Sequence, residues 1–369
     1  MHNDTLKEQP PHKEIPVITV QGTPYEVGRQ IGEATRETIR RIIMKDDPHW
    51  QKARKDILEY IEKTRIALPA VHEEMEGIAI GSNSNIRDVY LYVTEEISDH
   101  LENDDKDNDK EDGGCTDFAF TKPATKENHT LLGHTNDSDE VLLKDLIAFH
   151  RKITGEPEIF TIGMGPWTSV GYNTAGLGIG GNEVWMNDTK VGIPRSLLVR
   201  AILSEKELQK AVCIAVNSDR ASSYNLLLAS RDGDIVNIEG SGTQHELYSP
   251  QDGRLVHTNH YVLPHMTEYE AKDGKRLEES RSRFRRAMQL AISESQIDRF
   301  TIRRFLSDHE TCTINETHTT PICRHGNDPI GAYTIFWNVM DLTEGTIDFG
   351  AHPPCRSQTQ HFRLPYRTH

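Results

Sequence analysis

A run of 13 residues, 102–114, divides this chain into two unequal segments, because seven of them are acidic and none is apolar. Such a run cannot bury surface in a core, and its like charges keep it extended. We therefore expect a flexible acidic linker here, with folded structure on either side. A calcium loop is the alternative, but no register of the run supplies both the Gly at the sixth and the Glu at the twelfth position of an EF-hand.

The segment before the linker has the pattern of helices. Thr23-Pro24-Tyr25-Glu26 combines a capping residue, a Pro suited to the first helical position and the Glu of a capping box. Apolar residues follow at helical spacing to about Met44. Further helices are expected over 57–77 and 85–99.

The segment after Cys115 mixes strands with helices. Asp232-Gly233 and Glu344-Gly345 each separate two strand-like runs, as turns of β-hairpins do. The expected strands cover 115–121, 130–133, 224–229, 234–239, 333–341 and 346–350, and the expected helices cover 142–152, 193–203 and 277–292. Because strict βαβ order is absent, a layered α+β fold is favoured over a doubly wound parallel sheet.

Composition and charge exclude several partners. The net charge of −15 argues against nucleic acid and anionic membranes, both of which attract Lys and Arg. No apolar run approaches the roughly 20 residues that span a bilayer, and residues 1–14 lack the apolar core of a signal peptide. We therefore expect a cytoplasmic protein without a nucleic-acid or membrane partner. A homo-oligomer is compatible with these numbers.

The cysteine pattern argues against a disulfide framework or a zinc knuckle. The count is odd, the spacing is wide and no Cys-x-x-Cys pair occurs; the five are Cys115, Cys213, Cys312, Cys323 and Cys355. We expect no metal and no cofactor. In a reducing compartment a thiol would survive as a nucleophile.

Cys115 is the best candidate for such a nucleophile, because Gly113 and Gly114 precede it at the end of the linker. Glycine permits strained backbone geometry near a scissile bond. A cut after Gly114 would free an α-amine with an ordinary pKa of about 8, beside a thiol whose pKa is near 8.5. The amine could then take the thiol proton. In the uncut chain the thiol could attack the Gly114 carbonyl. Taken alone, however, a Gly-Cys pair is more often structural.

A series of motifs resembles the isopenicillin N acyltransferase family, peptidase family C45, which includes a β-alanyl-dopamine hydrolase branch. Gly113-Gly114-Cys115-Thr116 is similar to the family's processing site. The other matching stretches are Gly22–Gly28, Leu132–Asp137, Gly192–Arg195, His257–His260 and Pro321–His325. Ser282-Arg283-Phe284 is similar to a motif of the related choloylglycine hydrolases and penicillin V acylases. The resemblance covers most of 17–360.

This resemblance implies a four-layer αββα sandwich of N-terminal-nucleophile hydrolases. It implies a zymogen that cuts itself between Gly114 and Cys115. The products are an α chain, 1–114, which carries the linker 102–114, and a β chain, 115–369, and both belong to one domain.

The resemblance also assigns catalytic roles. Cys115 is the nucleophile, and Asn259 points its amide N–H at the developing oxyanion. Asp137 holds the new ammonium group or orients water. The bland alternatives are a turn-capping Asn259 and an Asx turn at Asp137. His134 suggests a Cys-His dyad. The α-amine freed by the cut already serves as the base, however, so a structural role is favoured for His134.

Two arginines of these motifs, with Asn173 and Glu239 outside them, are candidates for binding substrate. Arg324 could bind a substrate carboxylate in a bidentate manner, or form a surface ion pair. Arg283 matches the Ser-Arg-Phe motif, or belongs to a solvated basic helix face. Asn173 is expected to line the site or to supply a backbone donor. Glu239 is a weaker candidate.

Three functions remain open at this stage. The first is hydrolysis of a small N-acyl amide through an acyl-enzyme on Cys115. The second is transfer of an acyl group from a thioester such as an acyl-CoA to an amine. The third is a non-enzymatic acidic binding protein that keeps the fold, against which the intact Gly114, Cys115, Asp137 and Asn259 speak. Hydrolysis is slightly favoured, because the Gly-His-Thr and Gly-Ile-Pro-Arg stretches look closer to the β-alanyl amine hydrolases.

Overall fold

The computed structural model describes residues 13–43, 48–97, 113–271, 274–311, 319–326 and 331–366. The predicted acidic linker lies outside these ranges, apart from Gly113 and Gly114. None of the helices within them is both long enough and apolar enough to cross a membrane.

Two β-sheets form the centre of the described structure. One sheet has the spatial order β1 (Val17–Gly22), β4 (Leu146–Ile153), β5 (Ile159–Met164), β6 (Trp167–Asn173), β7 (Leu177–Asn182), β8 (Tyr224–Ser230), β9 (Ile235–Gly240) and β10 (His245–Tyr248). The other has the order β11 (Arg254–His257), β2 (Gly114–Phe120), β3 (Leu131–Ser138), β12 (Tyr333–Asp341), β13 (Thr346–Ala351) and β14 (Gln360–Arg363). We call them the β4–β9 sheet and the β2–β3 sheet.

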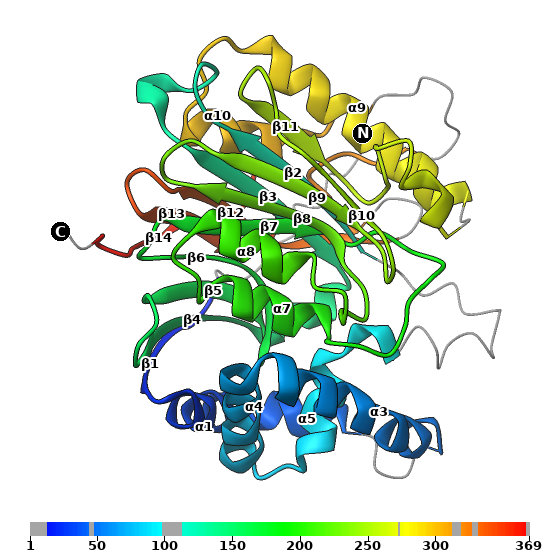
Figure 1. Ribbon diagram of the computed structural model, residues 1–369. Helices are drawn as coiled ribbons and strands as arrows, with labels where there is room; N and C mark the ends of the chain where they lie inside the picture. Colours follow the sequence, from blue (N-terminus) through cyan, green and yellow to red (C-terminus); the bar gives the residue numbers. More distant parts are fainter. Residues whose placement is uncertain are drawn as a thin grey trace, which may run out of the picture.

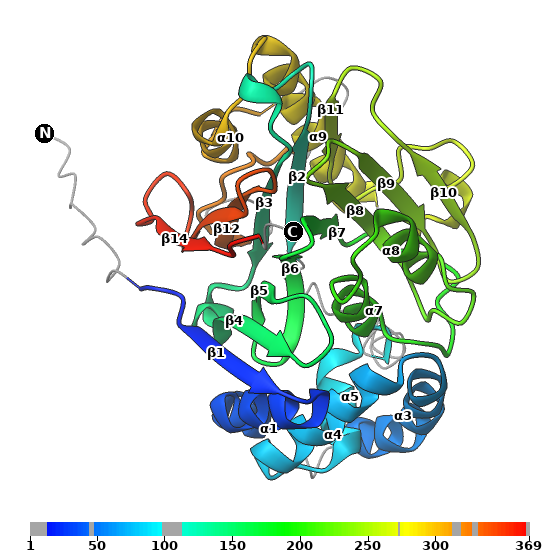
Figure 2. The same ribbon diagram turned by 60° about the vertical axis from the view of Figure 1, so that its left-hand side comes forward.

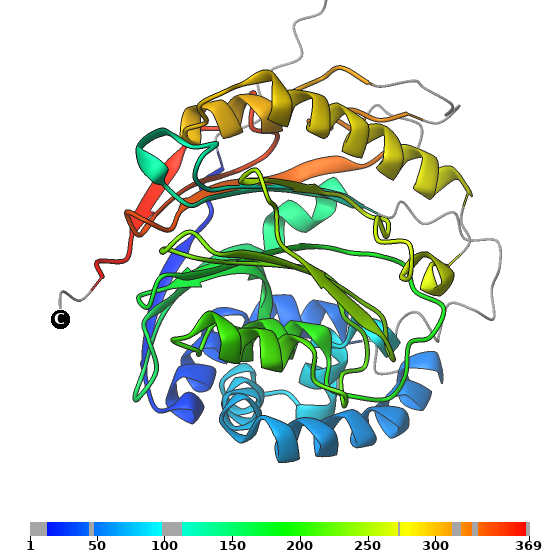
Figure 3. The ribbon, with the colours of Figure 1, turned by 45° about the horizontal axis from the view of Figure 1, so that its top comes forward.

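Helices cover the outer face of each sheet, so that Figure 3 shows four layers. The β2–β3 sheet is covered by α9 (Gly274–Ser293) and α10 (Arg299–Leu306). The helices on the side of the β4–β9 sheet are α1 (Pro24–Ala34), α2 (Arg36–Ile42), α3 (Pro48–Ala67), α4 (Pro69–Ser82), α5 (Ile86–Val93), α7 (Arg195–Ile202) and α8 (Leu208–Ala215) (Figure 1). The fold is therefore the αββα sandwich expected from the sequence.

Buried apolar side chains from both sheets fill the space between them. Ala119 and Leu132 on the β2–β3 sheet belong to one buried cluster with Phe160 and Leu227 on the β4–β9 sheet. Side chains alternate between the faces of a strand, so the neighbours Phe118 and Phe120 of Ala119 pack instead against α9 and α10. Central strands of each sheet, such as β2 and β8, are thus buried on both faces.

The segment before Gly113 joins the rest through the β4–β9 sheet. β1 pairs in parallel with β4, from Val17 opposite Ala148 to Gly22 opposite Ile153 (Figure 2). The helices that follow β1 pack Val27 and Ile31 into one cluster with Ile147 and Phe149 of β4. The chain on each side of the Gly114–Cys115 bond therefore contributes to one core.

Local signals predicted several elements correctly. Thr23 and Glu26 form the capping box at α1, and both hairpins occur, as β8–β9 and β12–β13. The helix expected over 57–77 is two helices, because Pro69 begins α4 after α3 ends at Ala67. The helix expected over 142–152 is wrong: a short 3-10 helix, Glu140–Asp145, leads into β4. A strand buried on both faces has a continuous apolar run, which periodicity cannot distinguish from a buried helix.

A buried ion cluster fastens α4 to the β4–β9 sheet and α7. Glu74 Oε2 accepts from Arg200 Nε at 2.7 Å, and its Oε1 accepts from Arg151 Nε at 3.4 Å. All three side chains are almost completely buried. Burial lowers the pKa of Arg151 to about 10 despite the attraction of Glu74. Both guanidinium groups nevertheless carry charge at neutral pH and need their acid partner.

We expect Glu74→Ala to lower the free energy of unfolding by about 3–5 kcal/mol, because it leaves buried cations without their shared carboxylate. The exposed i,i+4 pair Arg29–Glu33 supplies the control, since Glu33→Ala should change stability by about 0.5 kcal/mol or less. Urea unfolding followed by circular dichroism compares the two midpoints. Equal shifts would contradict a stabilising role for the buried cluster.

Candidate active site

Cys115 lies at the start of β2, in the middle of the sandwich. It pairs with Asn136 of β3, whose Nδ2 lies 3.8 Å from the Cys115 Sγ. By strand alternation the thiol shares a face with Asp117 and Ala119. That face looks toward the other sheet, because a Cβ added to Gly180 of β7 would lie 3.1 Å from Asp117 Oδ1. The thiol thus points into the layer between the sheets.

Asn259 and Arg283 hold the backbone of Cys115. The Cys115 N–H donates to Asn259 Oδ1 at 2.8 Å, and Arg283 Nη1 donates to the Cys115 carbonyl at 2.6 Å. Arg283 Nη2 donates to the same Asn259 oxygen at 2.9 Å. Two donors at one atom define that atom as the oxygen of the amide. All three residues are buried.

The amide nitrogen of Asn259 therefore points away from Cys115. Its Nδ2 donates to the backbone carbonyl of Glu183 at 2.8 Å. In the uncut chain Asn259 meets Cys115 through its oxygen, and its expected role as an oxyanion donor stays a prediction. The bland alternative of a turn-capping Asn does not describe these contacts.

Gly113 and Gly114 fit their places because they lack a side chain. A Cβ on Gly113 would lie 1.7 Å from the Asp137 carbonyl oxygen, so any other residue would push β2 away from β3. A Cβ on Gly114 would lie 2.7 Å from Arg283 Nη2 and 3.3 Å from Arg324 Nη1. The bond expected to be cut is thus held between a neighbouring strand and two guanidinium groups.

Asp137 and Arg324 lie on the α9 side of the sheet, opposite to the thiol. Thr334 connects them, since its hydroxyl donates to Asp137 Oδ1 at 2.6 Å and accepts from the Arg324 N–H at 3.0 Å. The Arg324 side chain is fully buried, 4.0 Å from Glu279. A surface ion pair at Arg324 and a solvated basic face at Arg283 are therefore both wrong.

The structure does not bring Asn173 to this cluster. Its Nδ2 donates to the carbonyls of Leu203 and Glu205, and its Oδ1 accepts from the N–H groups of Ala175 and Leu177. These bonds use its whole hydrogen-bonding capacity. The neighbouring Tyr172 hydroxyl donates to Gly345, in the turn at the far end of β12. Asn173 shapes a turn at the end of the sandwich remote from Cys115, and the expectation that it lines the site is not supported.

His134 is paired with Asp117, with 2.8 Å between His134 Nδ1 and Asp117 Oδ1. Both side chains are buried, and this contact supports the structural role favoured from the sequence. Asn136, by contrast, is a site residue that the sequence reasoning missed. Its side-chain amide meets the Cys115 thiol, because strand pairing sets Asn136 opposite Cys115.

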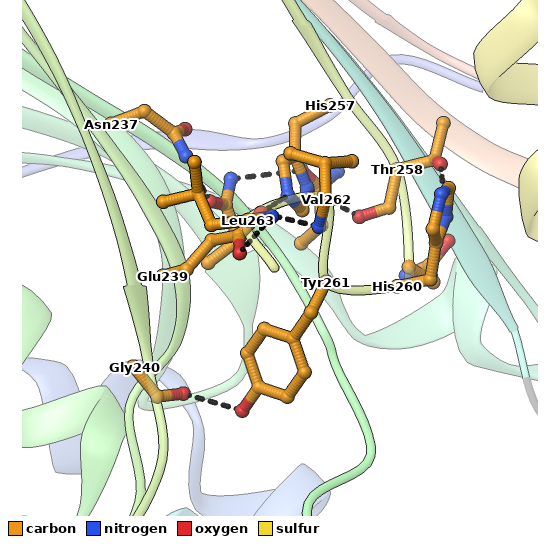
Figure 4. Close-up of polar contacts among 12 residues, drawn as sticks. Asn237, Glu239, Gly240, His257, Thr258, His260, Tyr261, Val262 and Leu263 are labelled. Carbon is orange, nitrogen blue, oxygen red and sulfur yellow. Dashed lines mark hydrogen bonds and ion pairs between the residues drawn. The ribbon is translucent and has the colours of Figure 1, made fainter. Parts of the chain in front are cut away.

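Glu239 anchors the segment that carries Asn259 (Figure 4). Its carboxylate accepts from the N–H groups of Val262 and Leu263 at 2.8 and 3.0 Å, and Oε1 lies 2.9 Å from His257 Nε2. Both side chains have no exposed surface. These contacts hold the chain on both sides of Asn259, so Glu239 is a positioning residue.

The surroundings of Cys115 keep its thiol protonated in the uncut chain. Burial raises the pKa of the Cys115 thiol, and the negative charges of Asp137, Asp117 and Glu183 raise it further, while Arg283 opposes them. A thiol in this state is a poor nucleophile at neutral pH. Attack by its sulfur therefore requires a base.

Comparison with known proteins gives the class of this protein, the amide hydrolases and acyltransferases. The sequence profile described as acyl-coenzyme A:6-aminopenicillanic acid acyl-transferase matches residues 124–349. The chain belongs to this family, and it is an enzyme of that class.

Curated relatives show the same similarity. The chain is 25% identical over 262 residues to the 40 kDa form of acyl-coenzyme A:6-aminopenicillanic-acid-acyltransferase of Emericella nidulans, covering 67% of this chain and 70% of that protein. It is 23% identical over 225 residues to the β-alanyl-dopamine/carcinine hydrolase of Drosophila melanogaster, covering 55% of this chain and 57% of that protein. Among solved structures, penicillin V acylase from Agrobacterium tumefaciens matches 68% of this chain and 86% of its own at 14% identity and a TM-score of 0.44.

We expect Glu239→Gln to loosen the loop after His257, because the new amide group faces backbone N–H donors that need an acceptor. Loss of such charge-assisted bonds should raise amide exchange at Val262 and Leu263 by about tenfold or more. Hydrogen–deuterium exchange with mass spectrometry measures this. Glu268→Gln is the control, because Glu268 is exposed in the same loop. Unchanged protection in Glu239→Gln would contradict the anchoring role.

Proposed function

We propose that this protein is a zymogen that cuts itself between Gly114 and Cys115 and then hydrolyses a small N-acyl amide through an acyl-enzyme on Cys115. The observation that carries the proposal is the hydrogen bond from the Cys115 N–H to Asn259 Oδ1. Pairing between β11 and β2 ends at His257 opposite Asp117, so beyond it a side chain, not a strand carbonyl, accepts from Cys115. The same oxygen can accept from an α-amine after a cut.

The self-cleavage step needs only groups of this chain and water. The Cys115 sulfur passes its proton to a water molecule, which acts as the base, and attacks the Gly114 carbonyl carbon. The C–N bond breaks, the leaving nitrogen takes a proton, and a thioester joins Gly114 to the sulfur. Water hydrolyses this thioester, giving a Gly114 carboxylate and a Cys115 that carries both a free thiol and an α-amine. Arg283 and Arg324 lie beside Gly114, where their charge favours an oxyanion.

In the cut enzyme the α-amine is the base. It takes the thiol proton as the sulfur attacks the substrate carbonyl, and it gives the proton to the leaving amine. Water then attacks the acyl-enzyme, and the acid product leaves. Asn259 is proposed to hold the amine and, with its N–H released from Glu183, to face the oxyanion. Asp137 is proposed to balance the charge of the new ammonium group.

The place of the substrate acyl group follows from the self-cleavage step. The same sulfur attacks both carbonyls, so the acyl group occupies the place that Gly114 occupies in the uncut chain. Arg283 and Arg324 flank that place. Both are therefore proposed to bind substrate, and a small acyl group with a polar or anionic end fits them.

Acyl transfer is the second candidate, because the Emericella relative is named an acyltransferase while the Drosophila relative is named a hydrolase. The two reactions share the acyl-enzyme and differ in whether water or an amine attacks it. A reducing compartment such as the cytoplasm would preserve the thiol for either reaction.

Purified wild-type protein should run as two chains on a denaturing gel, the larger one beginning at Cys115. Cys115→Ala should remain one chain, because it lacks the sulfur, while Cys213→Ser should be cut like wild type, because Cys213 is an exposed cysteine of α8. N-terminal mass determination identifies the new end. A wild-type chain that stays whole would refute the zymogen and the enzyme mechanism together.

With the cut protein, small N-acyl amides should release free acid and amine, and acyl-CoA plus an amine should give less amide than acid. Mass spectrometry of the products separates the two reactions. Acyl transfer without hydrolysis would replace the preferred function by the second candidate. Absence of both, with Cys115 inert to alkylation after the cut, would favour the non-enzymatic binding protein.

A further inference from the structure

A second cluster of reactive side chains is separate from the residues that contact Cys115. Within the described ranges, His309, Cys323, His325 and Cys355 each bring one ligand atom to within 4.8 Å of all the others. The two sulfurs are 3.5 Å apart, and His325 Nε2 lies 3.7 Å from Cys323 Sγ and 3.4 Å from Cys355 Sγ. His309 Nε2 lies 3.0 Å from His325 Nε2.

These separations match those around a tetrahedral zinc ion. With Zn–S of about 2.3 Å and Zn–N of about 2.05 Å, tetrahedral angles place two sulfurs about 3.8 Å apart, sulfur and nitrogen about 3.6 Å apart and two nitrogens about 3.3 Å apart. The four separations given by individual atom pairs, 3.5, 3.7, 3.4 and 3.0 Å, agree with these values within about 0.3 Å. The His309 side chain is exposed and can adjust to complete the fourth position.

We propose that His309, Cys323, His325 and Cys355 form a structural Zn²⁺ site. Two thiolates neutralise the charge of the ion, two neutral imidazoles complete the coordination, and two thiol protons leave on binding. Thiolate and imidazole ligands select zinc over magnesium or calcium. Four protein ligands leave no open position for water, so the ion is not a catalytic one.

The framework that presents the four ligands is held by contacts that do not involve the ion. The Cys323 N–H donates to the Asp308 carbonyl at 3.0 Å, which places Cys323 beside His309. Arg303 of α10 donates to the carbonyls of Pro354 and Ser357 at 3.3 and 3.1 Å, which fixes the loop of Cys355. A zinc ion would join the ends of α10 and β13 to the segment before β12.

A zinc ion at this position would also stabilise part of the active site. Arg324 lies between the ligands Cys323 and His325, and its N–H donates to Thr334, whose hydroxyl donates to Asp137. Fixing Cys323 and His325 therefore fixes the buried guanidinium beside Gly114. The sequence predicted no zinc site, because its cysteines are odd in number, widely spaced and without a Cys-x-x-Cys pair, whereas the ligands here come from three separate segments.

The test is the metal content of the full-length protein, purified with reductant and without chelator. Elemental mass spectrometry should find about one zinc per chain. Cys323→Ser and Cys355→Ser should lose most of it, whereas Cys355→His, which restores a ligand, should retain it. Cys213→Ser and Cys115→Ala should keep the full amount, because neither residue belongs to the cluster.

Cobalt tests the geometry independently of any variant. Protein stripped of metal and given Co²⁺ should show the intense visible bands of tetrahedral cobalt and a thiolate charge-transfer band, and both should be lost in Cys355→Ser.

Three results would overturn the proposal: reduced wild type that binds neither ion, full zinc in Cys323→Ser and Cys355→Ser, or a Cys323–Cys355 disulfide in freshly purified metal-free protein. Because zinc content does not depend on cleavage, failure here leaves the proposed function standing.

Discussion

The Cys115 N–H donates to the side-chain oxygen of Asn259, and the surrounding structure converges on this hydrogen bond. The two residues lie far apart in sequence and meet because β11 pairs with β2. Arg283 donates to both the Asn259 side-chain oxygen and the Cys115 carbonyl. One guanidinium group therefore fixes the Cys115 carbonyl and the acceptor of the Cys115 N–H. These hydrogen bonds hold Cys115 opposite Asn136 of β3, whether the Cys115 nitrogen belongs to an amide or to an amine.

Buried charge is the second constraint on this site. Burial lowers the pKa of Arg283, and repulsion by the charge of Arg324 lowers it further, while Asp137 and Glu279 oppose both effects. Charges removed from water are tolerated only when they are paired and hydrogen-bonded. The cluster therefore needs all its members, and the space beside Gly114 is strongly polar although Gly114, Arg283 and Arg324 are buried. A site of this kind favours chemistry in which negative charge develops on a carbonyl oxygen.

The architecture explains how a chain could be cut without falling apart. β1 pairs with β4, and the helices after β1 share a buried cluster with the same strand. These contacts lie away from the Gly114–Cys115 bond, so breaking that bond removes none of them. Hydrophobic burial, which is proportional to the apolar area removed from water, would continue to hold the two products together.

Local sequence determined the elements whose signals are short-range. The capping box of Thr23 and Glu26 and the turns at Asp232-Gly233 and Glu344-Gly345 each act within a few residues. The order of the motifs along the chain indicated the family and, through it, the expected fold. Periodicity failed over 142–152, where only burial between two layers distinguishes a strand from a helix.

Tertiary structure alone decided which polar residues meet. It placed Asn173 in a remote turn, buried Arg283 and Arg324, turned the Asn259 oxygen toward Cys115, and brought Cys323 and Cys355 together with two histidines. The type of a side chain determines which hydrogen bonds it can donate or accept and which metals it can bind. Its partners are set by strand pairing and helix packing between distant segments, which no local spacing encodes.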